Sequence, residues 1–152
     1  MVRALKKRDI THKSLLIIFI NRFIKNGSKF LIYKNFLSVL IVLKSKLKKS
    51  FNLILSEIMN LISPLIQLIP KFASGVIYLI PDFPKYKKSF TLGLNFLIKA
   101  IKNRKENSLN YRILYEFRDI LNNKGLALKY KQEFYKLAIT NRHLLFKFSK
   151  LK

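Results

Sequence analysis

The side chains best suited to acid–base or metal chemistry are few and widely spaced in this sequence of 152 residues. His12 and His143 are its two histidines, and neither is spaced to act together with a carboxylate. The acidic residues are scattered along the chain: Asp9, Glu57, Asp82, Glu106, Glu116, Asp119 and Glu133. The sequence has no cysteine and no glycine-rich loop that could hold a phosphate. We therefore expect no enzyme activity, no catalytic residue, no metal site and no cofactor.

Basic side chains, in contrast, are numerous. The chain carries 31 lysines and arginines against 7 acids, a net charge of +24, although 50% of its residues are hydrophobic. Like charges at this density repel one another in a compact fold, whereas nucleic-acid phosphates neutralise them and release counterions on binding. For any single lysine, a solvated surface position is the more ordinary interpretation. For the whole set, the charge predicts a polyanion as the partner.

The apolar residues predict a mainly α fold, a six-helix bundle with a β-hairpin inserted between the third and fourth helices. A basic arm covers residues 1–13, and a single helical domain covers residues 14–152. The predicted helices run from 14 to a break at 25–27, then over 28–47, 51–62, 86–102, 109–121 and 126–146. Asn107 or Ser108 is the expected N-cap of the fifth helix.

The middle of the chain has a different composition. Between residues 64 and 84 it contains four prolines, which exclude a long helix. Two short strands, residues 65–69 and 76–80, are predicted to meet around Ser74 and Gly75, giving a ribbon over about 65–84. Two strands are marginally stable alone in water. The ribbon must therefore pack on the helices or project toward a partner that holds it.

Membrane association is the main alternative to polyanion binding. The longest run without a charged residue, 58–70, has 13 residues, whereas a span needs about 20, so we expect no membrane span. Residues 35–43 are followed by four lysines and could form an interfacial helix. The rival function is thus that of a basic, membrane-associated organellar assembly protein.

Several short patterns in the chain resemble one known family. They comprise Phe19, Asn21, Gly27 and Lys29; Pro64, Gly75, Tyr78 and Pro81; Leu92, Ala100, Arg104, Ser108, Arg112, Glu116 and Asp119; and Asn123-Lys124-Gly125 with Ala127, Lys129, Ala138 and Asn141. At this spacing, over more than half of the chain, the sequence resembles the small-subunit ribosomal protein seven family of bacterial and organellar type. We interpret Asn123 and Gly125 as residues needed for backbone geometry.

This resemblance implies a structural constituent of the small ribosomal subunit. It implies binding to the 3′ major domain of small-subunit rRNA, organisation of head assembly beside other head proteins, and a ribbon near the exit-site tRNA and the mRNA path. Charge, position and resemblance together give these candidate RNA-binding residues: Arg3, Lys6, Lys7, Arg8, Lys25, Asn26, Lys29, Lys71, Tyr78, Lys88, Lys99, Lys102, Arg104 and Arg112. Lys88, Lys99 and Lys102 fall on one side of the predicted fourth helix. Tyr78 suits either stacking on a base or packing within the ribbon.

The sequence also departs from the family pattern. Ser28 replaces a basic residue after Gly27, and Phe72, Val76 and Ile77 make the ribbon apolar where basic or polar residues are common. An apolar ribbon leaves open packing against another protein instead of tRNA. Residues with AT-rich codons, namely Phe, Ile, Lys, Asn and Tyr, number 75 of 152. This bias favours a mitochondrial, organelle-encoded protein, with a plastid or an AT-rich bacterium as the alternatives.

Overall fold

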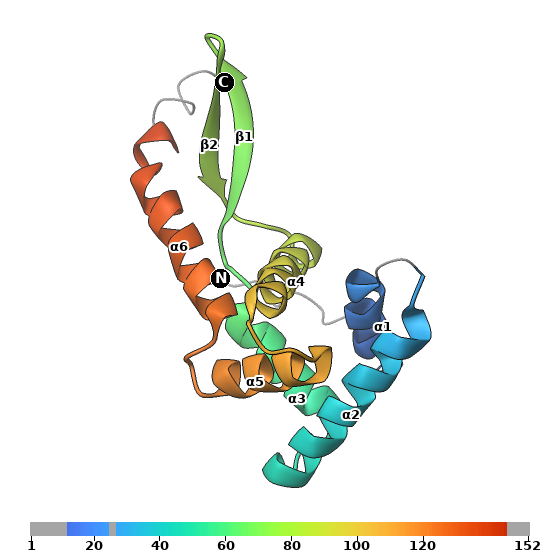
Figure 1. The fold of residues 1–152 in the computed structure, drawn as a ribbon. Coiled ribbons are helices and arrows are strands. Elements are labelled where there is room, and N and C mark those ends of the chain that lie inside the picture. The colour runs from blue at the N-terminus through green and yellow to red at the C-terminus, as the bar shows by residue number, and fades with distance from the viewer. Residues whose placement is uncertain (1–11, 25–26, 146–152) are drawn as a thin grey trace.

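The computed structural model describes residues 12–24 and 27–145 of the chain, as a helical body with one β-hairpin (Figure 1). Its elements are α1 (His12–Phe23), α2 (Lys29–Leu47), α3 (Phe51–Ile62), β1 (Gln67–Ala73), β2 (Val76–Asp82), α4 (Tyr86–Asn103), α5 (Leu109–Leu121) and α6 (Leu126–Thr140). The predicted mainly α fold with a hairpin between the third and fourth helices is confirmed. The basic arm, including Arg3, Lys6, Lys7 and Arg8, and the predicted contacts Lys25 and Asn26 lie outside the described residues.

Local signals account for most helix ends. Gly27, with a φ of +73°, has the left-handed conformation in the link between α1 and α2. Lys48, with a φ of +52°, closes α2 through a hydrogen bond from its amide to the Lys44 carbonyl. Pro64 follows α3 two residues after its end. Ser108 is the N-cap of α5, because its hydroxyl oxygen accepts a hydrogen bond from the Tyr111 amide at 3.4 Å.

Two predicted helix boundaries were wrong. α1 begins at His12, two residues earlier than expected. The predicted helix over 126–146 is divided: α6 ends at Thr140, residues 141–142 form a turn, and residues 143–145 are helical again. The Arg142 amide bonds the Ile139 carbonyl three residues back at 3.1 Å, so the last turn tightens and the α-helical ladder stops.

The ribbon strands are longer than predicted, because both interior prolines fit the ladder. Ser74 and Gly75 have φ values of +49° and +78°, as a two-residue type I′ turn requires. Pairs alternate between hydrogen-bonded and non-hydrogen-bonded along an antiparallel ladder, starting from the hydrogen-bonded pair beside the turn. Pro70 faces Leu79 and Pro81 faces Leu68, both at non-hydrogen-bonded positions, where the missing N–H costs no ladder bond.

The ribbon projects from the helical body, and hydrogen bonds join the segments at its base to that body. Figure 1 shows it extending away from α3 and α5, with its tip as the most distant point. Near the base, the Leu65 amide donates to the Tyr135 hydroxyl at 2.9 Å, and the Ser89 hydroxyl donates to the Pro64 carbonyl at 2.6 Å. At the tip, Phe72 is 75% exposed. Of the two arrangements open from sequence, the structure therefore has the projecting one.

The core forms where the helices converge below the ribbon. Phe19 of α1, Phe36 of α2 and Phe117 of α5 are fully buried and pack ring against ring, with centroids 6.2 to 6.4 Å apart. Along α6, Ala138 is buried, whereas Leu137 is 44% exposed. Among the described residues no helix is both long and apolar enough to cross a membrane.

We predict that the ribbon can be shortened without unfolding the helices. Replacing residues 70–79 by Asn-Gly leaves Ile69 opposite Ile80 beside a two-residue turn, in the same ladder phase as Ala73 and Val76 in the intact hairpin. Far-UV circular dichroism should retain the helical signal, and the urea midpoint should stay close to that of the full chain. Loss of the helical signal would show that the ribbon supports the bundle.

Candidate nucleic-acid interface

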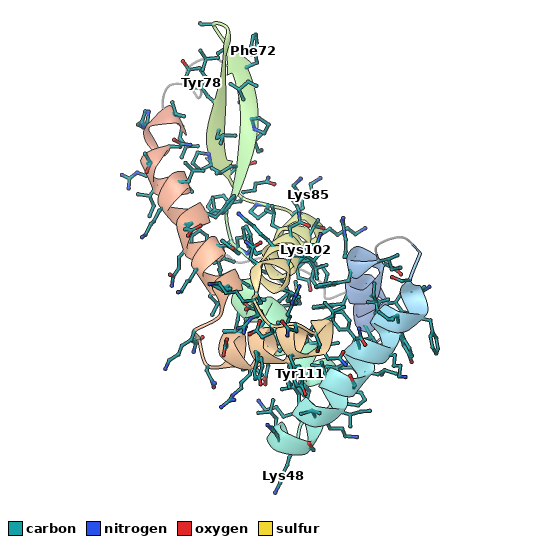
Figure 2. The ribbon with its side chains drawn as sticks, in the orientation of Figure 1. Lys48, Phe72, Tyr78, Lys85, Lys102 and Tyr111 are labelled. Carbon is teal, nitrogen blue, oxygen red and sulfur yellow. The ribbon has the colours of Figure 1, made fainter. Side chains whose placement is uncertain are left out.

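Basic side chains on α4 form an exposed stripe, which we define as Lys88, Lys99 and Lys102. The positions i, i+11 and i+14 repeat on one side of a helix, so the stripe predicted from sequence exists as a surface. Lys99 and Asn103 are held by Tyr130 of α6: the Lys99 ammonium lies 4.5 Å from the ring centroid, and the Asn103 amide donates to the hydroxyl at 2.7 Å. Figure 2 shows Lys102 on α4.

Arg104, at the end of α4, points inward instead. Its Nε lies 2.8 Å from Glu116 and one terminal nitrogen lies 2.9 Å from Glu106. The other terminal nitrogen pairs with Asp119. The side chain of Arg104 is 11% exposed and that of Glu116 is fully buried. Arg104, which the sequence placed among the RNA contacts, is therefore occupied by three carboxylates, and we assign it a structural role.

Arg112 has a similar internal role. Its Nε donates to the backbone carbonyl of Glu106 and fixes the loop between α4 and α5. Burial acts to lower the pKa of Arg104, but the hydrogen bonds that Arg104 donates to Glu116, Asp119 and Glu106 outweigh it and hold that pKa above its usual value. The pKa of the Glu106 carboxyl is lowered, first by its own backbone amide and then by Arg104, so it stays ionised. We therefore assign Arg104 a structural role, whereas RNA contact by Arg112, whose Nε alone is engaged within the described residues, stays a prediction.

Glu116 links this cluster to the start of α6. While one of its oxygens pairs with Arg104, the other accepts a hydrogen bond from the Ala127 amide at 2.9 Å, in the first turn of α6. Such an amide would otherwise lack a partner. Gly125 has an ordinary negative φ of −64°, but a Cβ there would lie 2.6 Å from Ile120 and 3.0 Å from Glu116. Gly125 is needed for close approach, whereas Asn123, with a φ of +59°, is needed for the backbone conformation.

The Arg104 cluster makes the rest of the described surface more basic. Of the six acidic residues in the described ranges, three surround Arg104. Glu57 pairs with Lys49 at 2.6 Å. Asp82 and Glu133 are exposed on the ribbon and on α6. The exposed lysines therefore face few neighbouring carboxylates, and none of these acids lies on α4.

The remaining predicted contacts lie on separate elements. Lys29 is exposed at the start of α2. Lys71 and Tyr78 face each other across the ribbon as a cross-strand pair, which the predicted shorter strands did not contain. Figure 2 shows Tyr78 in the part of the ribbon near its tip. The structure thus brings Lys71 beside Tyr78 but does not bring them to the α4 stripe.

Sequence reasoning missed one exposed aromatic group on α5. Tyr111 and Tyr115 stack on each other with centroids 6.0 Å apart, and Arg118 is exposed one turn further along. The i, i+4, i+7 spacing was visible in the sequence and could have identified them.

Comparison with known proteins identifies the family. The family model described as ribosomal protein S7p/S5e matches residues 2–142. The chain belongs to the ribosomal protein S7p/S5e family. Members of this family are structural, non-enzymatic ribosomal proteins, which agrees with the expectation of no enzyme activity.

Three relatives of this S7p/S5e chain are each named small ribosomal subunit protein uS7. The relative from Wigglesworthia glossinidia brevipalpis is 28% identical over 140 residues, which cover 92% of this chain and 90% of the relative. That from Clostridium kluyveri is 27% identical and covers 90% of each chain. That from Dictyoglomus thermophilum is 25% identical, over 88% of this chain and 86% of the relative.

We predict that Glu116→Gln destabilises the fold strongly. The substitution keeps the shape and the acceptor for Ala127 but removes the buried negative charge opposite Arg104. Breaking such a pair costs about 3 to 5 kcal/mol, and we expect about 3 because Asp119 and Glu106 remain. Urea denaturation measures the change.

Glu57→Gln is the matched control for that substitution. Its ion pair with Lys49 joins two side chains that are 45% and 40% exposed, and such pairs contribute about 1 kcal/mol or less. Equal losses of stability in the two variants would contradict a structural role for the Arg104 cluster.

Proposed function

We propose that this protein is a structural constituent of the small ribosomal subunit that binds the 3′ major domain of small-subunit rRNA and organises assembly of the head. The observation that carries the proposal is the S7p/S5e family match over residues 2–142. The matches with the three relatives extend over 86 to 90% of each relative, and these relatives are named as small-subunit proteins. That the bound region of the rRNA is the 3′ major domain is what the family resemblance in the sequence implies.

The charge distribution supports this proposal physically. The α4 stripe presents three ammonium groups to solvent, while three carboxylates that could neutralise nearby lysines surround Arg104 instead. Contacts from Lys88, Lys99 and Lys102 to phosphates give salt-dependent affinity without reading bases. The rRNA in turn offsets the repulsion within a chain of net charge +24.

The arm and the segment before α2 extend the proposed interface. Arg3, Lys6, Lys7, Arg8, Lys25 and Asn26 are assigned to rRNA by their charge and position in the sequence. Lys29 follows them at the exposed start of α2.

The ribbon is proposed to face a second set of partners. Through Lys71 and Tyr78 it reaches toward exit-site tRNA and the mRNA path, and other head proteins surround the body. Its projection supports this assignment, because a two-stranded hairpin is only marginally stable in water by itself and gains stability from a partner. The exposed apolar residues Phe72 and Ile77 favour a protein neighbour at the tip itself.

We propose a mitochondrial ribosome as the site of action, with the protein encoded in the organelle. The AT-rich codon composition supports this, and the bacterial relatives are equally compatible with a plastid or an AT-rich bacterium. A membrane-associated assembly protein is the rival function.

Sedimentation separates these two functions. After extraction of the source organelles or cells in high salt, we expect the protein to travel with small subunits through a sucrose gradient, although high salt weakens each phosphate contact. Recovery in the membrane pellet without rRNA would contradict the proposed function and favour the rival.

A paired lysine substitution tests the α4 stripe. Lys88→Gln with Lys102→Gln should weaken binding to a transcript of the 3′ major domain. The slope of log affinity against log salt should fall by about 0.7 to 0.9 for each phosphate that the variant no longer neutralises. Lys99 is left intact because it also packs on Tyr130.

The matched control for the stripe removes the same charge elsewhere. Lys34 on α2 and Lys136 on α6 are exposed and lie outside the proposed interface. Lys34→Gln with Lys136→Gln should leave the salt slope nearly unchanged. The same loss of slope in both double variants would show that α4 has no special part in RNA binding.

A further inference from the structure

The stacked tyrosines of α5 are the first residues of an exposed stripe of aromatic and polar side chains. Tyr111, Tyr115, Arg118 and Asn122 follow one another at i, i+4, i+7 and i+11, which places them on one side of the helix. Tyr111 is 56% exposed and Tyr115 is 38% exposed. Their rings are nearly parallel, with an interplanar angle of 20°. This face is separate from the α4 stripe and points away from the core.

The tyrosines are not placed there by core packing. The core side of α5 consists of Ile113, Phe117 and Ile120, all fully buried. Tyr111 and Tyr115 instead leave aromatic surface in water, and exposed apolar surface of this kind marks a site of interaction when charged groups surround it.

The tyrosine stripe borders a hollow between α5 and the end of α2. The hollow has a volume of about 310 Å³. Its lining includes Lys46 from α2 and Tyr115, Arg118 and Asn122 from α5 and its C-cap. Four leucines contribute to its lining, and Lys46 and Arg118 bring positive charge to it from two different helices. Figure 2 shows Tyr111 on α5 and Lys48 at the far end of α2.

Charge decides which occupant fits. None of the residues that line the hollow is acidic. Asp119, beside Arg118 in the sequence, is paired with Arg104. Glu57 is paired with Lys49 just past the end of α2. A flat aromatic surface next to two cations fits a planar base joined to a phosphate, because every base can stack on an aromatic ring.

We propose that this α2–α5 surface binds an unpaired nucleotide of RNA, with the base stacked on the Tyr111–Tyr115 pair and a phosphate held by Lys46 and Arg118. This inference rests on the proposed function for the identity of the RNA. It adds to that function a contact that recognises a single-stranded nucleotide, whereas the α4 stripe contacts phosphates alone.

The test measures the contribution of the tyrosine rings to binding separately from that of the positive charges. It uses the full chain, with a transcript of the 3′ major domain as the probe. Tyr111→Leu with Tyr115→Leu should lower affinity roughly five- to a hundredfold, the usual effect of losing one stacked base, and leave the salt slope unchanged. Tyr111→Phe with Tyr115→Phe keeps both rings and should bind within about twofold of the original chain on the same principle. Circular dichroism confirms that each variant is folded.

A charge variant keeps the proposal testable if the leucine variant does not fold. Arg118→Gln changes no ring and should reduce the salt slope by about 0.7 to 0.9, the amount for one phosphate. An unchanged slope would overturn the phosphate contact in the proposal.

Two further outcomes would overturn the proposal as a whole. If the leucine variant binds the transcript like the original chain while Lys88→Gln with Lys102→Gln binds weakly, the α5 site is wrong and the proposed function stands. If the leucine variant binds the transcript normally but enters small subunits poorly, the occupant is a protein. If the unaltered chain does not bind the transcript, that result contradicts the proposed function and, with it, this inference.

Discussion

The buried pair of Arg104 and Glu116 is the interaction on which the helical body depends. A fully buried carboxylate is tolerable only when its oxygens are matched by charge and hydrogen bonds. Here one oxygen meets the guanidinium that ends α4, and the other caps the first turn of α6 through Ala127. One side chain on α5 therefore joins the helices before and after it. Gly125 makes this possible, because a Cβ there would occupy the same space.

The same cluster shapes the surface charge. By drawing Glu106, Glu116 and Asp119 around one arginine, the fold removes half of its described carboxylates from the neighbourhood of the lysines. What remains outside is strongly basic, and it repels itself in the absence of a polyanion. Stability in the interior and affinity for RNA at the surface thus have a common origin.

The proposed contacts with RNA and other partners are made by three surfaces, each on a different secondary-structure element. The α4 stripe offers flexible ammonium groups suited to phosphates at varied positions. The α5 tyrosines offer a rigid flat surface suited to a base, with Arg118 beside them. The ribbon extends away from the helical body, because a type I′ turn and prolines at non-hydrogen-bonded positions allow two long strands to pair without a third. Each surface uses the property that its secondary structure supplies most readily.

The sequence by itself determined the order and type of the elements, because the signals that end them are local. Gly27, Pro64 and Ser108 act within a few residues of where they stand, so they could be interpreted without tertiary contacts. The tertiary structure alone decided which cations reach solvent. Arg104 resembled an RNA contact by family pattern, but its partners Glu116 and Asp119 lie 12 and 15 residues further on and reach it only when α4 and α5 pack together. The solvent exposure of a side chain depends on how the helices pack together, so it cannot be inferred from residue spacing along a single helix.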